Sequence, residues 1–328
     1  MKRRSFILAT GAWLIAAAVN VSAQGKRPQR IGMLSLGMSM SRSKELEAIL
    51  QALQEAGYVE GRDIVIDERF ADGRPEKLPA LAAELVALNP AVIVTYGTAG
   101  VTAVKNAGTS VPIVFASAGD PIGSGFIASY RRPGGRITGV SSAAPGGQAG
   151  LEGKMLEMIS ETLPAAKLIG VIVHRPDPVH RAIATRISRA AVSLGLETSS
   201  AMVDRAEELE RTFGEMAARK LHALFVPDQF FFGVNRLRIA ELALKSRIAL
   251  FCLASDDAGN LLSLTTDSAD ILRRVGRMVG QILKGEKPAE IPVDQPERFY
   301  LTVNLKTAKM LGLKIPQSIL VRADRVVE

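Results

Sequence analysis

The chain has a single cysteine among its 328 residues, and aromatic residues make up only 5% of it. One cysteine excludes an intramolecular disulfide. Cys252 lies in the apolar run Ala249–Leu253, which predicts a buried core thiol rather than an activated nucleophile. The sequence also lacks a long block of lysine and arginine. We therefore expect no nucleic-acid-binding surface, which would need clustered basic and aromatic residues.

Long hydrophobic runs are scarce as well. Beyond the N-terminal segment, no stretch approaches the run of about 18 apolar residues that indicates a membrane-spanning helix. The formal charge of +8 includes three basic residues of that segment, Lys2, Arg3 and Arg4. The other charges are interspersed, which is typical of a solvated surface.

The N-terminal segment has the pattern of a secretory signal peptide. Lys2–Arg4 is followed by the apolar run Phe6–Val21 and then by small residues that end at Ala23. This order predicts a signal over residues 1–23. The Arg3-Arg4 pair also resembles the twin-arginine signal, so the Sec and twin-arginine routes both stay open. No cysteine follows Ala23 to carry a lipid anchor, and we expect a soluble periplasmic protein.

Enzyme signatures are missing. The chain has no G-x-S-x-G nucleophile elbow and no G-x-x-x-x-G-K-[ST] phosphate loop. The G-x-G-x-x-A stretch Gly123–Ala128 does not follow a predicted strand, so we interpret it as a turn. His174 and His180 flank a loop without metal-ligand spacing, and we expect them to be exposed to solvent. The sequence thus predicts no catalytic residue, no metal site and no cofactor.

Strand and helix patterns alternate along the chain. This alternation predicts parallel sheets covered by helices, an α/β fold. The small-residue stretch 141–147 divides it into two similar Rossmann-like lobes, with a (β/α)₈ barrel as the rival fold. The predicted strands are 30–36, 64–70, 91–96, 112–116, 137–140, 167–174, 196–203, 223–226 and 249–253, and the predicted helices are 43–56, 78–88, 98–107, 151–162, 179–194, 206–219, 236–245 and 268–283.

Polar and small residues follow the predicted strands at their carboxyl ends, where parallel sheets place their ligands. A glycine and a threonine at the start of a helix favour a carboxylate or phosphate, and Asp120 is suited to an ammonium group. Each position also fits an ordinary strand-to-helix turn, but the set favours a ligand cleft. The candidate ligand-binding residues are Gly97, Thr98, Ser117, Asp120, Ser141, Asp228 and Ser255.

Several segments resemble one known family. They are Leu53–Arg62, Leu78–Val86, Pro112–Ala116, Gly119–Gly123, Arg132–Gly135, Ile282–Pro288 and Asn304–Leu313. With them, the chain is similar to the periplasmic substrate-binding proteins of ABC transporters whose better-known members bind tryptophan or tyrosine.

The resemblance implies a fold like that of type I periplasmic binding proteins, with the ligand held between two lobes and no catalysis. Residues 30–140 and about 256–292 would form lobe 1, and residues 141–255 and about 293–328 would form lobe 2. By the same resemblance, Gly97, Thr98, Ser117 and Asp120 line the cleft from the first lobe. Ser141 falls at a hinge and Asp228 in the second lobe.

The sequence departs from the family where Leu264-Thr265 replaces a common Tyr-Gly pair. An aromatic amino acid is therefore not assumed as the ligand. We expect a monomeric solute-binding component of an ABC importer, which captures a small anionic or zwitterionic, amino-acid-like solute by lobe closure. Its partners would be a membrane permease and an ATPase. A ligand-sensing module for a membrane receptor and an exported α/β enzyme are the alternatives.

Overall fold

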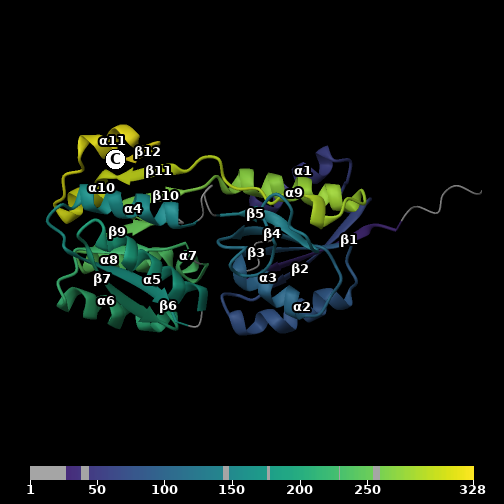
Figure 1. Ribbon diagram of the computed structural model, residues 1–328, viewed down its shortest axis with the longest axis horizontal. Coiled ribbons are helices and arrows are strands. Elements are labelled where there is room, and N and C mark those ends of the chain that lie inside the picture. The colour runs from purple at the N-terminus through teal and green to yellow at the C-terminus, as the bar shows by residue number, and fades with distance from the viewer. Residues whose placement is uncertain (1–26, 38–43, 143–147, 176–177, 229, 254–258) are drawn as a thin grey trace, which may run out of the picture.

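The chain folds into two α/β lobes that lie side by side (Figure 1). The computed structural model describes residues 27–37, 44–142, 148–175, 178–228, 230–253 and 259–328. The predicted signal peptide and Ser255 lie outside these residues. None of the helices in the described part of the chain combines the length and apolar character that crossing a bilayer requires.

The first lobe is built on a five-stranded sheet in the order β2-β1-β3-β4-β5, with all its strand pairs parallel. Helices cover both faces, and each face has its own apolar core. The elements of this lobe are β1 (Gln29–Ser35), α1 (Lys44–Glu55), β2 (Ile64–Phe70), α2 (Leu78–Ala87), β3 (Val92–Tyr96), α3 (Gly97–Asn106), β4 (Ile113–Ala118), β5 (Ile137–Ser141) and α9 (Ser268–Leu283).

The second lobe has a seven-stranded sheet in the order β12-β11-β10-β9-β8-β6-β7, in which only β10 and β11 pair antiparallel. Two apolar cores again flank the sheet. Its elements are α4 (Gln148–Thr162), β6 (Leu168–His174), α5 (Pro178–Val192), β7 (Glu197–Val203), α6 (Leu209–Ala218), β8 (Ala223–Val226), α7 (Phe230–Val234), α8 (Arg236–Lys245), β9 (Ala249–Cys252), β10 (Leu262–Thr265), β11 (Tyr300–Asn304), α10 (Leu305–Leu311), α11 (Gln317–Arg322) and β12 (Arg325–Val327).

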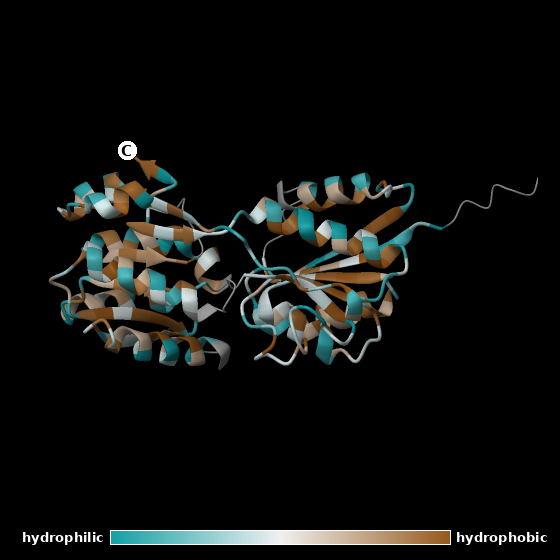
Figure 2. Cartoon of the chain, turned by 45° about the horizontal axis from the view of Figure 1, so that its top comes forward, coloured by the Kyte–Doolittle hydropathy of each residue, from teal (hydrophilic) through white to brown (hydrophobic). Residues whose placement is uncertain are grey.

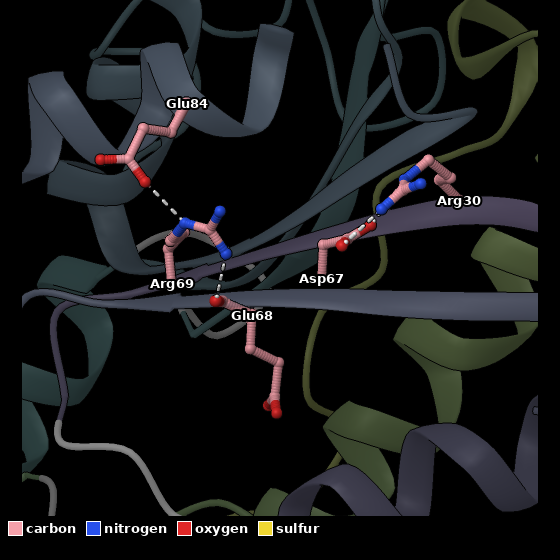
Figure 3. Close-up of polar contacts among 5 residues, drawn as sticks. All are labelled: Arg30, Asp67, Glu68, Arg69 and Glu84. Atoms are coloured by element: carbon pink, nitrogen blue, oxygen red, sulfur yellow. Dashed lines mark hydrogen bonds and ion pairs between the residues drawn. The ribbon is translucent and has the colours of Figure 1, made fainter. Parts of the chain in front are cut away.

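Burial along each strand explains its place in the sheet. The inner strands β3 and β8 are buried along nearly their whole length, as expected for parallel strands covered on both faces. They appear as apolar bands inside both lobes, whereas polar residues gather on the helices (Figure 2). The edge strand β2 carries charges instead: Asp67 accepts two hydrogen bonds from Arg30, and Arg69 donates one to Glu84 on α2 (Figure 3). Charges of this kind discourage pairing with another chain.

Three segments connect the lobes. The first follows β5 and leads to α4, the second joins β10 to α9, and the third runs from Asp294 to β11. Asp294 still belongs to the first lobe, because it pairs with Val140 of β5. Strand β10 pairs within the second sheet, so the second crossing comes after Thr265, about ten residues later than the sequence suggested.

Two separate sheets exclude the barrel and confirm the two-lobed α/β fold. The strand and helix predictions match the described elements closely up to Cys252. The elements α7, β10, β11, β12, α10 and α11 were not predicted as such. Cys252 is buried as predicted, and burial raises the pKa of its thiol. His174 and His180 are buried, so the expectation that they are exposed is wrong: His180 Nδ1 accepts the His174 backbone N–H at 2.7 Å.

Helices α1 and α9 pack closely at Gly276, and substitution there should be destabilising. A Cβ atom at Gly276 would lie 2.7 Å from both Ala52 Cβ and the Ile49 carbonyl oxygen. We expect Gly276→Ala to lower the free energy of unfolding by about 1–3 kcal/mol in urea denaturation, since such overpacking forces the helices apart. Gly214→Ala on α6 is the matched control, because a Cβ there meets nothing within 4 Å. An equal loss in both variants would contradict the packing argument.

Candidate functional site between the lobes

The turn from β3 into α3 carries two of the predicted ligand-binding residues. Gly97 has a φ of +66°, a backbone conformation that glycine adopts without strain, and begins α3 immediately after Tyr96. Thr98 follows in the first turn, and both residues are partly exposed. The amide groups at the start of this ten-residue helix favour a negatively charged group.

The end of the neighbouring strand β4 is irregular. Its pairing with β5 shifts register between Ala116 and Ala118, and the intervening Ser117 has a φ of +60°. Such bulges redirect side chains at the ends of strands, and an L-residue in this conformation is strained. Asp120 is exposed, and its Oδ1 accepts the Gly123 N–H at 2.8 Å. The carboxylate of Asp120 therefore already closes a turn.

Ser141 and Ser142 have different environments at the end of β5. Ser141 is fully buried: its hydroxyl donates to the Ala118 carbonyl at 2.9 Å, and its N–H donates to the Asp294 carbonyl at 2.8 Å. Ser141 thus fastens β5 to the bulged end of β4 and to the third crossing. Ser142 is the residue that meets the second lobe.

Asp228, which follows β8 in the second lobe, lies next to Ser142 of the first. Burial raises the pKa of Asp228 from 3.8 to about 6, and the neighbouring Ser142 hydroxyl opposes this shift. The Ser142 hydroxyl has no hydrogen-bond partner of good geometry within the described residues. In the same part of the chain, Asp228 makes no ion pair. The boundary between the lobes therefore holds a partly buried carboxyl that has no cation beside it in the described part of the chain.

A second, electrostatic interaction across the boundary involves Arg186 on α5. It donates two hydrogen bonds, at 2.6 and 2.7 Å, to Glu152 on α4, whose side chain is only 1% exposed. Desolvation raises the pKa of Glu152 although Arg186 opposes the change. The hydrogen bonds to Glu152 raise the pKa of Arg186, and the negative charge of Asp120 in the first lobe adds to this rise. Arg186 and Asp120 therefore lie within electrostatic reach of each other.

The structure thus brings Gly97, Thr98, Ser117 and Asp120 to one edge of the first sheet and Asp228 to the facing side of the second. Sequence reasoning placed Ser142 at the crossing between the lobes without assigning it to the site, and it missed Glu152 and Arg186. Ser142 directly follows a predicted site residue, but no sequence signal separates Glu152 and Arg186 from other charges on helices. Among the described residues, no cluster of histidine, cysteine or carboxylate side chains has the arrangement of a metal site.

A profile of the family described as "ABC transporter substrate binding protein" matches residues 34–327. The chain belongs to this family. Proteins of the ABC transporter substrate-binding family are solute-binding proteins rather than enzymes, are typically extracytoplasmic and act with a membrane ABC transporter.

Individual proteins agree with this assignment. A tyrosine-binding protein from Clostridioides difficile (strain R20291) is 24% identical over 311 residues, which cover 91% of this chain and 85% of that protein. The ABC domain from Streptococcus pneumoniae in complex with L-Trp is 26% identical, with a TM-score of 0.82 over 92% of this chain and all of the other. A conserved domain protein from Vibrio cholerae shares the fold, with 23% identity and a TM-score of 0.83 over 92% of this chain and all of the other.

Replacement of Asp228 should stabilise the ligand-free protein in a pH-dependent way. Since its folded-state pKa is raised from 3.8 to about 6, the charged carboxylate destabilises the fold above pH 6, and this penalty disappears as the pH falls towards 4. We expect Asp228→Asn to raise the Tm by about 3–6 °C at neutral pH, with no gain at acidic pH.

Asp63→Asn serves as the control for this experiment. The hydrogen bond from Arg62 lowers the pKa of Asp63, so its replacement should not stabilise the protein at neutral pH. A gain for Asp228→Asn that is the same at every pH would contradict the role of charge.

The Glu152–Arg186 pair should behave as a unit. Arg186→Met leaves the buried Glu152 carboxylate without its partner, and we expect a loss of about 3 kcal/mol in the free energy of unfolding. The double variant Glu152→Met/Arg186→Met should recover most of this loss, because no charge then stays buried. Urea denaturation measures both, and equal losses in the single and double variants would argue against a coupled pair.

Proposed function

We propose that this chain is the exported solute-binding component of an ABC importer, and that it captures a small, zwitterionic, amino-acid-like solute by closing its lobes. It delivers the solute to a membrane permease that an ATPase drives. It works as a soluble monomer in the periplasm, where the signal pattern over residues 1–23 directs it.

The observation that carries this proposal is the partly buried carboxyl of Asp228, which lies beside Ser142 at the boundary between the lobes, has its pKa raised by desolvation and has no ion pair in the described part of the chain. A carboxylate removed from water without a cation gains most when a ligand brings a positive charge. We assign the solute's ammonium group to Asp228 rather than to Asp120, because Asp120 is exposed and its carboxylate accepts a backbone N–H. Ser142, beside Asp228, supplies a hydroxyl to the same group.

The first lobe offers the complementary environment. The amino terminus of α3, with Gly97 and Thr98, favours the solute's carboxylate, and Ser117 on the bulge next to it adds a hydroxyl. A solute that contacts Thr98 in one lobe and Asp228 in the other binds the closed arrangement better than an open one. Lobe closure then follows from this difference in affinity.

The solutes of the relatives fit the proposed head group. One relative is a tyrosine-binding protein, and another was solved with L-Trp; both solutes are α-amino acids. The side chain of the solute is a separate matter. Leu264, at the departure from the family pattern, is buried in the core of the second lobe, and Thr265 pairs with Tyr300 on β11. We therefore propose an α-amino-acid head group for the solute and do not assign it an aromatic side chain.

The experiment compares matched solutes by thermal shift and then by calorimetry. Each L-amino acid is tested beside its deaminated acid and its decarboxylated amine, since ligand binding raises the Tm. We expect a shift only for zwitterions. Asp228→Asn should weaken the affinity roughly 10- to 100-fold, as loss of a charged hydrogen bond does, and Thr98→Ala should weaken it less.

Asp63→Asn is the control, because Asp63 precedes the edge strand β2 and is remote from the boundary between the lobes. Equal affinity for a zwitterion and its deaminated acid would exclude the ammonium contact. Unchanged affinity in Asp228→Asn would exclude this residue as its partner.

A further inference from the structure

A polar cavity of about 260 Å³ lies between the end of β5 and the second and third connections between the lobes. It is separate from the proposed solute site. Its lining includes Val140 at the end of β5, Thr266 and Asp267 of the second crossing, and residues 296–298 of the third. Because the second and third connections form part of its wall, beside Val140 of β5, we expect rotation of the lobes to change its shape.

Arg274 on α9 projects into this region from the first lobe. Its side chain is only 19% exposed and lies among three carboxylates. It donates a hydrogen bond to Asp270 at 2.7 Å and lies 3.7 Å from Asp294 and 3.6 Å from Glu297. Asp270 is on the same helix as Arg274. The backbone N–H and carbonyl of Asp294 both form hydrogen bonds with the backbone of β5. Both residues are attached to the first lobe, so of the three carboxylates only Glu297 lies in the crossing beyond Asp294.

The next residue, Arg298, is held by the second lobe. It donates a hydrogen bond to Asp324 at 2.6 Å, and its guanidinium lies 4.8 Å from the centre of the Tyr300 ring. Asp324 is itself fixed in the second sheet, since its other oxygen accepts the Leu301 N–H at 2.8 Å. Adjacent residues of opposite charge are thus attached to opposite lobes, and the chain must bend between them when the lobes rotate.

We infer that Arg274, Glu297 and Arg298 form an electrostatic lock at the hinge, which holds the lobes in the arrangement seen here and which salt weakens. The Arg274–Glu297 distance exceeds that of a hydrogen bond, and Glu297 is 82% exposed. This contact is therefore mainly coulombic and open to screening. The lock deepens the proposed function, because it regulates the lobe closure on which solute capture rests.

Spin labels on opposite lobes test the lock in the full mature chain without any solute. Ala80 on α2 and Ala218 on α6 are exposed, and both helices lie on the side of the lobes away from the connections (Figure 1). Cysteines at these two positions carry the labels, because the native Cys252 is buried. Pulsed dipolar spectroscopy then gives the distribution of distances between the lobes at about 20 mM and about 500 mM NaCl.

We expect the distribution of the parent chain to move away from the present arrangement at high salt. Glu297→Gln and Arg298→Gln should produce that change at low salt, with a roughly two- to five-fold change in the ratio of the two populations, as for an exposed ion pair. Both side chains are exposed, so neither variant threatens folding. The control is Glu290→Gln, which removes an exposed charge that has no ion pair in the described part of the chain.

Three results would overturn the lock: a distribution that does not respond to salt, a Glu297→Gln variant identical to the parent chain at low salt, or a control that moves as far as Glu297→Gln. Failure of the proposed function would be seen elsewhere, as the absence of any zwitterion that raises the Tm. Because the distances are measured without solute, the two failures are distinguishable.

Discussion

Parallel pairing forces each connection between neighbouring strands to cross a face of the sheet, so the strand-to-helix turns gather at one edge. In the first lobe this rule places the turns after β3 and β4 side by side, with Gly97, Thr98, Ser117 and Asp120 on them. In the second lobe it places Asp228 after β8. The contact between Asp228 and Ser142 shows that these edges face each other. The site, the connections and the hinge all depend on this arrangement.

Polar groups at the boundary are held at some cost to stability. The Asp228 carboxyl is desolvated, and Ser117 adopts a strained backbone conformation. Proteins tolerate such features where ligand binding offsets the lost stability. A solute that carries an ammonium group would have this effect at Asp228. Glu152 differs, because its buried charge is already paired with Arg186. The first carboxylate is suited to a ligand, and the second to holding an arginine in place.

The connections combine rigid and adaptable parts. Ser141 and Asp294 attach the end of β5 firmly to the third crossing through backbone hydrogen bonds. A few residues later, Glu297 and Arg298 are held by ion pairs. We expect these ion pairs to weaken when the lobes rotate and when salt is added. This change from hydrogen-bonded backbone to exposed ion pairs marks the place where we infer the hinge of the third crossing.

Local patterns in the sequence sufficed for much of the fold. Apolar runs at strand spacing, together with helix-ending glycines, identified most elements up to Cys252. Glycine and hydroxyl residues after strands predicted the sheet edge at which we propose that the solute binds. Strand β12 was missed because three residues are too few for a periodic pattern. Strands β10 and β11 were missed because their antiparallel pairing departs from the strand–helix alternation on which the prediction relied. The burial of His174 and His180 was missed because it depends on residues distant in the sequence that pack around them.

The sequence by itself determined the α/β class, the division into two lobes and the family, because these follow from residue order and from short motifs. Only the tertiary structure decided the roles of individual side chains. In it, the buried Ser141 hydroxyl hydrogen-bonds to the Ala118 carbonyl, Asp228 lies beside Ser142, and Arg186 lies within electrostatic reach of Asp120. These relations join residues tens of positions apart, and desolvation and ion pairing depend on distances that the order of residues does not contain.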